Sequence, residues 1–130
     1  MKNLSIFLTL FILTFLLIVL VESSEKIEIK TFETNKLNYF SGEEMKVRIK
    51  IVSDSKKLNV TLFGIKDRFG KYRIWYSNVF PVNDTLELNL TFKLPSCYGC
   101  AGISPGNYSI SLLVKNRKIL KRSLLISIQP

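Results

Sequence analysis

The two cysteines are the first residues in this sequence that could carry chemistry. Cys97 and Cys100 lie in a loop rich in glycine and proline, between residues 95 and 106. Outside the cytoplasm, a local disulfide is the simplest use of such a pair. It would shape the loop rather than hold the domain together, because closing so short a loop contributes at most about 2 kcal/mol. We therefore predict a disulfide between Cys97 and Cys100.

Two other uses of the cysteine pair stay open. A redox Cys-x-x-Cys centre needs a thiolate of low pKa, commonly supplied by a helix that begins just after the first cysteine. The glycines and prolines of this loop disfavour such a helix. A zinc site needs two more ligands, and the chain contains no histidine, so two copies would have to pool their cysteines.

The lack of histidine also excludes the commonest catalytic sites. Without histidine there is no Ser-His-Asp or Cys-His nucleophilic site and no histidine-containing metal motif. Asp54, Asp67 and Asp84 lie in predicted turns, where the side chain ordinarily caps the backbone. Glu43 and Glu44 are neighbours at the start of a predicted strand, so they point to opposite faces. The sequence therefore predicts a protein that is not an enzyme and has no cofactor or metal.

Basic residues dominate the charge of the chain. The formal net charge is +9 at pH 7, and Lys46, Arg48 and Lys50 share the outer face of one predicted strand. These three are candidate contacts for an anionic surface outside the cell, such as lipid head groups or acidic glycans. The alternative is a solvated face whose lysines prevent aggregation. Further basic clusters surround a predicted turn, residues 66–73, and the C-terminal segment 115–122.

Aromatic residues lie beside the basic turn. Tyr72, Trp75 and Tyr76 could stack on sugars or bases. The commoner use of a lone tryptophan in a β-sandwich is core packing. The pattern does not fix which face Trp75 takes.

Outside the first 23 residues, four Asn-x-Ser/Thr sequons are candidate sites of N-glycosylation. Their asparagines are Asn59, Asn83, Asn89 and Asn107. Asn89 lies on the polar face of its predicted strand, where it would carry a glycan if that face meets solvent. The alternative is that these tripeptides reflect only the frequency of Asn, Ser and Thr in the chain.

The first 23 residues differ from all the others. Lys2 supplies a positive charge, and residues 4–21 are uncharged and strongly apolar. This run is long for the core of a signal peptide, about 7 to 15 residues, and close to the minimum of about 17 for a transmembrane helix. Both a cleaved signal peptide and a retained membrane anchor stay open. In either case the basic flank stays inside, so residues 24–130 form a domain on the extracellular side of the membrane, secreted or anchored.

From residue 27 onward the hydrophobic period is two, which is typical of strands with one buried face. Residues 45–51 and 86–94 alternate apolar and polar side chains without a break. Shorter alternating runs begin near residues 27, 58, 72, 108 and 124. About seven short strands at this spacing predict an all-β fold, an antiparallel two-sheet sandwich preceded by one hydrophobic helix.

Two short motifs resemble immunoglobulin-like modules of secreted and cell-surface proteins. They are Phe40-Ser41-Gly42-Glu43 and Pro105-Gly106-Asn107-Tyr108, each leading into an alternating strand. The resemblance covers residues 27–128 and implies the immunoglobulin-like sandwich, with a corner hydrogen bond from Tyr108. The widely spaced cysteine pair and central tryptophan of antibody domains are absent, so the resemblance carries no function. The Lys- and Ile-rich, Ala-poor composition resembles that of proteins from AT-rich genomes, including archaeal ones.

These observations favour an exported, non-enzymatic interaction domain. Its partner would be an unknown protein, a glycan or an anionic surface, and the membrane itself if residues 4–21 are retained. Nucleic acid is not expected, because export removes the usual nucleic-acid partners. The alternative is a structural subunit of a surface layer or filament that assembles through its sheet edges. A third hypothesis is a thiol-redox or metal-binding protein that uses Cys97 and Cys100.

Overall fold

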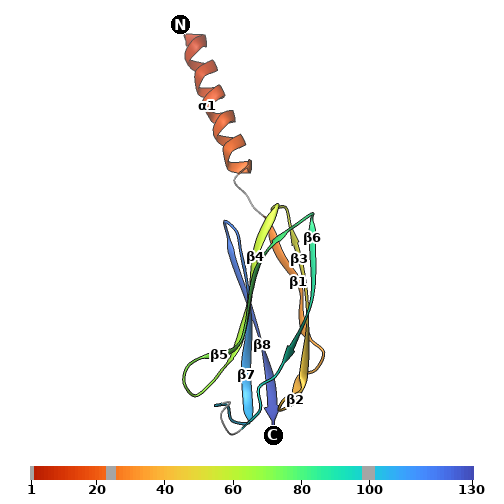
Figure 1. Ribbon diagram of the computed structural model, residues 1–130. Helices are drawn as coiled ribbons and strands as arrows, with labels where there is room; N and C mark the ends of the chain where they lie inside the picture. The colour runs from red at the N-terminus through yellow and green to blue at the C-terminus, as the bar shows by residue number, and fades with distance from the viewer. Residues whose placement is uncertain (1, 23–25, 98–101) are drawn as a thin grey trace.

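Two β-sheets pack face to face, and a single helix precedes them in the chain (Figure 1). The structure, a computed structural model, describes residues 2–22, 26–97 and 102–130. It confirms the predicted sandwich and places eight strands after the helix. The elements are α1 (Lys2–Glu22), β1 (Ile27–Thr34), β2 (Asn38–Phe40), β3 (Glu44–Ser53), β4 (Lys57–Lys66), β5 (Tyr72–Pro81), β6 (Thr85–Lys93), β7 (Gly106–Lys115) and β8 (Ile119–Gln129).

The strands divide into a sheet of three and a sheet of five. The three-stranded sheet has the order β1-β3-β6, and the five-stranded sheet has the order β2-β8-β7-β4-β5. Every pairing is antiparallel except that of β2 with β8, which is parallel. The sequence predicted seven of the eight strands. It missed β2, because three residues are too few to show alternation.

The core fills the space between the two sheets. In β3 the predicted alternation holds, with Met45, Val47, Ile49 and Ile51 buried between exposed or half-buried polar residues. The five-stranded sheet supplies the opposite side of the core, largely from the central strands β4 and β7. Burial of these aliphatic side chains is the main force that holds the sheets together.

A tyrosine fixes the entry to β7. The Tyr108 hydroxyl donates a hydrogen bond to the Ser104 carbonyl oxygen and accepts one from the Ser104 backbone N–H at 3.1 Å. The predicted corner hydrogen bond is therefore confirmed. It ties the start of the strand to the loop four residues upstream.

The apolar side chains of α1 face solvent. They are exposed from Leu4 to Leu17, so this described part of the helix does not pack against the sandwich. Among the residues that the structure describes, no helix is long and apolar enough to cross a membrane. The interpretation of residues 4–21 as a transmembrane helix is corrected on this point.

Cys97 belongs to the core rather than to a disulfide. The structure shows it as a free cysteine, only 9% exposed, in a bridge with Ile103. The predicted Cys97–Cys100 disulfide is therefore wrong for Cys97, and Cys100 lies outside the described residues. The physical reason is burial, since Cys97 packs with Leu94 and Ile103 as a small hydrophobic side chain.

Candidate functional site

Three aromatic side chains gather on the outer face of the five-stranded sheet. Trp75 of β5 is 64% exposed, and its ring centroid lies 5.9 Å from that of Phe63 on the neighbouring strand β4. Tyr72, which is 40% exposed, meets Phe63 edge-on at 5.1 Å. We call this surface the aromatic face. Core packing, the commoner role of a lone tryptophan, is thus not the role of Trp75.

An irregularity in β4 brings the cluster together. Gly64 and Ile65 are buried in succession, which breaks the alternation of the strand, and Ile65 takes a positive φ of 54°. For a β-branched residue this conformation is a true outlier, and such strain is found preferentially at functional sites. With strict alternation Lys66 would face the core. Instead it is exposed, opposite Tyr72 in the register, on the same surface as Phe63.

A shallow hollow of about 340 Å³ adjoins the aromatic rings. Its floor passes over Gly64, where an added Cβ atom would lie 2.5 Å from the Ser109 carbonyl oxygen. Serine hydroxyls line the other side, and Ser111 and Ser123 hydrogen-bond to each other at 2.8 Å. The absence of a side chain at Gly64 therefore allows β4 and β7 to approach closely beside the hollow.

Two lysines stand over the aromatic rings. The Lys66 ammonium lies 6.0 Å from the Tyr72 ring centroid, and the Lys121 ammonium lies 5.9 Å from that of Phe63. Both lysines also line the hollow. In the part of the chain that the structure describes, neither makes an ion pair, so both charges remain uncompensated.

The five-stranded sheet contains no acidic residue. None of β2, β4, β5, β7 and β8 includes Asp or Glu. The basic residues of these strands are Lys57, Lys66, Arg73, Lys115, Lys121 and Arg122. The positive charge of the domain is therefore concentrated on one sheet.

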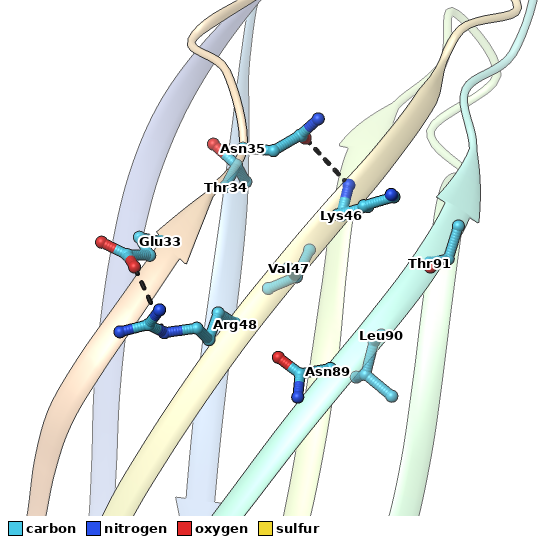
Figure 2. A pocket seen from close by; sticks show the side chains of 9 residues that line it. All are labelled: Glu33, Thr34, Asn35, Lys46, Val47, Arg48, Asn89, Leu90 and Thr91. Carbon is cyan, nitrogen blue, oxygen red and sulfur yellow. Dashed lines mark hydrogen bonds and ion pairs between the residues drawn. The ribbon is translucent and has the colours of Figure 1, made fainter.

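The three-stranded sheet differs, because three of its cations are paired with carboxylates. Figure 2 shows Arg48 of β3 beside Glu33 of β1, at 3.4 Å between Nε and Oε1. Lys50 pairs in the same way with Glu87 of β6 at 3.5 Å. The predicted anionic contacts Lys46, Arg48 and Lys50 do lie on one outer face, yet cross-strand carboxylates compensate two of them.

A second hollow, shown in Figure 2, lies on the three-stranded sheet. It measures about 400 Å³ and lies across the ends of β1, β3 and β6. The side-chain oxygen of Asn35, which lines it, accepts hydrogen bonds from the Lys46 backbone N–H at 3.0 Å and from the Tyr39 hydroxyl at 2.7 Å. Asn35 therefore holds the loop after β1 in place.

The four predicted glycan acceptors are all exposed. Asn59 and Asn107 belong to the five-stranded sheet, and Asn107 lines the hollow of the aromatic face. Asn89 lies on the other sheet, directly opposite Arg48 in the register. Asn83 lies between β5 and β6. Exposure makes each one accessible, but it does not establish a glycan.

No protein-family model and no curated protein matches the sequence. Solved structures do share the fold. The alkylpurine DNA glycosylase AlkC of Pseudomonas fluorescens, bound to DNA containing an abasic site analog, has a TM-score of 0.57 at 15% identity, over 80% of this chain and 30% of that one. The sporulation control protein Spo0M of Bacillus subtilis has a TM-score of 0.53 at 13% identity, over 83% and 50%.

A third similar structure is a single domain that this chain covers almost completely. It is the CARDB domain of the PF1109 protein of Pyrococcus furiosus, in complex with di-metal ions, with a TM-score of 0.53 at 9% identity, over 80% of this chain and 93% of that one. This chain spans half or less of AlkC and Spo0M. Within residues 2–22, 26–97 and 102–130, no three Cys, Asp or Glu residues gather closely enough to hold a metal ion. At these identities the similarity establishes a β-sandwich and nothing about activity.

Proposed function

We propose that this chain is an exported, non-enzymatic binding module, and that it takes carbohydrate on its aromatic face. The observation that carries the proposal is the exposure of Trp75 in contact with Phe63. Trp75 lies on the outer face of the sheet, although the inner face of the same sheet packs against the core. Exposed aromatic clusters of this kind are costly to keep in water and mark interaction sites. The apolar, uncharged segment 4–21 supports export of the domain.

Carbohydrate suits the chemistry of the aromatic face. A pyranose ring has an apolar C–H face that can lie against Trp75, and hydroxyl groups around its rim. The serines beside the hollow, including Ser109, offer hydroxyls that both donate and accept hydrogen bonds. The face is open and shallow, which fits a repeating polymer better than a small molecule, since small-molecule sites enclose most of the ligand.

The intrinsic fluorescence of Trp75 tests the proposal directly. Trp75 is the single tryptophan of the chain, so any change in emission reports on this face. We expect titration of the full chain with soluble polysaccharides to give a saturable change in emission. Calorimetry should show that Trp75→Ala weakens the same binding by about tenfold or more, because truncated tryptophans often dominate binding energies.

The matched control is Phe40→Ala. Phe40 is 62% exposed but lies on the short strand β2, away from the cluster. Its loss should leave polysaccharide binding unchanged. If no polysaccharide alters the emission, or if Trp75→Ala binds as tightly as the parent chain, the proposal is wrong.

Assembly through sheet edges is the second candidate function. It is favoured by β6, a nine-residue strand at the edge of its sheet, which among the described strands pairs with β3 alone. Such an edge offers backbone groups for strand addition by another copy. This hypothesis predicts concentration-dependent assembly in sedimentation velocity, and a chain that stays monomeric at high concentration would argue against it.

A further inference from the structure

We infer that the carbohydrate bound on the aromatic face is acidic, with a carboxylate or sulfate group placed between Lys66 and Lys121. The inference rests on the proposed function and adds the chemical class of the ligand. It starts from the position of the two lysines. The Lys66 ammonium lies near the Tyr72 ring and the Lys121 ammonium near the Phe63 ring, both close to the upper distance limit of a cation–π contact. Both lysines also line the hollow where a sugar would lie.

Charge compensation separates Lys66 and Lys121 from three cations of the three-stranded sheet. On the three-stranded sheet, Lys30 pairs with Glu28 at 3.1 Å, and Arg48 and Lys50 have their own carboxylates. No such partner exists for Lys66 or Lys121 among the described residues. An anionic ligand would supply the missing negative charge.

The surroundings of the hollow favour an anion over a neutral ligand. No Asp or Glu lines it, and the five strands that form its sheet carry none. An approaching carboxylate or sulfate therefore meets the two ammonium groups with no carboxylate among the residues that line the hollow. Aromatic rings and serine hydroxyls beside the lysines supply contacts for the sugar ring that carries the acid.

The expected preference is modest, because both lysines are exposed. One exposed ion pair changes a binding constant by roughly twofold to fivefold. Two together should give an acidic oligosaccharide about a tenfold advantage over its neutral counterpart. The advantage should shrink as the salt concentration rises, since exposed charges are screened.

Calorimetry with two matched probes tests the inference on the full chain. The probes are an oligogalacturonate and a galactose oligomer of the same length. We expect the oligogalacturonate to bind about tenfold more tightly, and Lys66→Gln with Lys121→Gln to remove most of this difference. The control, Lys46→Gln with Lys50→Gln, removes two charges from the opposite sheet and should preserve the preference.

The outcomes separate the inference from the proposed function. If both oligomers bind equally and Trp75→Ala weakens both, carbohydrate binding stands and the acidic preference is wrong. If neither oligomer binds, both are wrong. If a single-stranded oligonucleotide binds more tightly than the oligogalacturonate, the face recognises nucleic acid, and the inference is overturned. Equal losses in the two double variants would also contradict it, because they would indicate an effect of net charge alone.

Discussion

At the residue scale, the aromatic side chains of β5 divide into those that pack in the core and those, such as Trp75, that face solvent. Its neighbours in β5, Ile74 and Tyr76, face the core, and Tyr76 packs edge-on against Phe92 at 6.4 Å. Trp75 lies between them and therefore faces out. The sequence grouped Tyr72, Trp75 and Tyr76 as candidate stacking residues, and the structure keeps only the first two on the outer surface.

Tyr108 carries the first prediction. Removing its hydroxyl in Tyr108→Phe deletes both hydrogen bonds to Ser104. The Ser104 groups are exposed and can bond to water instead, so the free energy of unfolding should fall by about 1 kcal/mol. Urea denaturation measures the change. An unchanged unfolding midpoint would show that the corner is not a stabilising feature.

Cys97 gives a second prediction, which concerns its burial. Cys97→Ser should lower the free energy of unfolding by about 1 to 3 kcal/mol, because it buries a hydroxyl among apolar side chains. Cys97→Ala should cost less, since it loses only a small apolar group. In the folded chain, mass spectrometry should find Cys97 protected from alkylation. Rapid alkylation, or equal effects of the two variants, would contradict the assigned core position.

At the element scale, the sequence predicted the strands better than it predicted their irregularities. Unbroken alternation defined β3 and β6 with nearly correct bounds. The residue types at this point did not predict the positive φ of Ile65, because isoleucine ordinarily favours regular strand geometry. The hydrophobic period therefore could not predict the irregularity in β4. Nor could it predict that Lys66 and Tyr72 lie on one surface.

The close approach of β4 and β7 at Gly64 carries the third prediction. In Gly64→Ala the new Cβ atom would meet the Ser109 carbonyl oxygen, so the strands must move apart. We expect the free energy of unfolding to fall by about 1 to 3 kcal/mol. Thermal unfolding measures it. Asn59→Ala, an exposed substitution in the same strand, should change stability by less than about 0.5 kcal/mol, and equal effects would refute the close contact.

Glu43 makes the turn before β3 sensitive to pH. Hydrogen bonds from the Lys36 side chain and from the Phe40 backbone N–H lower the pKa of this carboxyl below its ordinary value of 4.5. The ionised form is therefore favoured in the folded chain. Its stabilising contribution is complete above about pH 4.5 and is lost as the pH falls through the lowered pKa.

Glu43→Gln provides the fourth prediction, which tests this linkage. At pH 7 the variant should unfold at a lower urea concentration than the parent chain. The difference should shrink as the pH falls from 4.5 through the lowered pKa, where the parent carboxyl also becomes neutral. A difference that stays constant from pH 7 to pH 3 would show that ionisation of Glu43 does not matter.

At the scale of the whole molecule, the two sheets differ in charge. Glu87 is the last acidic residue of the chain, so β7 and β8 contain only basic charges. That asymmetry was visible in the sequence, but it gained meaning only when the topology joined these strands to β4 and β5, which also lack acids. The sequence alone favoured the cations of β3, where in the structure the carboxylates of β1 and β6 compensate two of the three.

The most direct test of the account follows the indole N–H signal of Trp75 in a ¹H–¹⁵N correlation spectrum during titration with oligogalacturonate. One tryptophan gives one indole signal, and its ring belongs to the aromatic face in contact with Phe63. We predict a progressive, saturable shift, accompanied by shifts of the backbone signals of Phe63 and Ser109. Shifts confined to Lys46, Arg48 and Lys50, with the indole signal unmoved, would contradict the account and return the binding site to the three-stranded sheet.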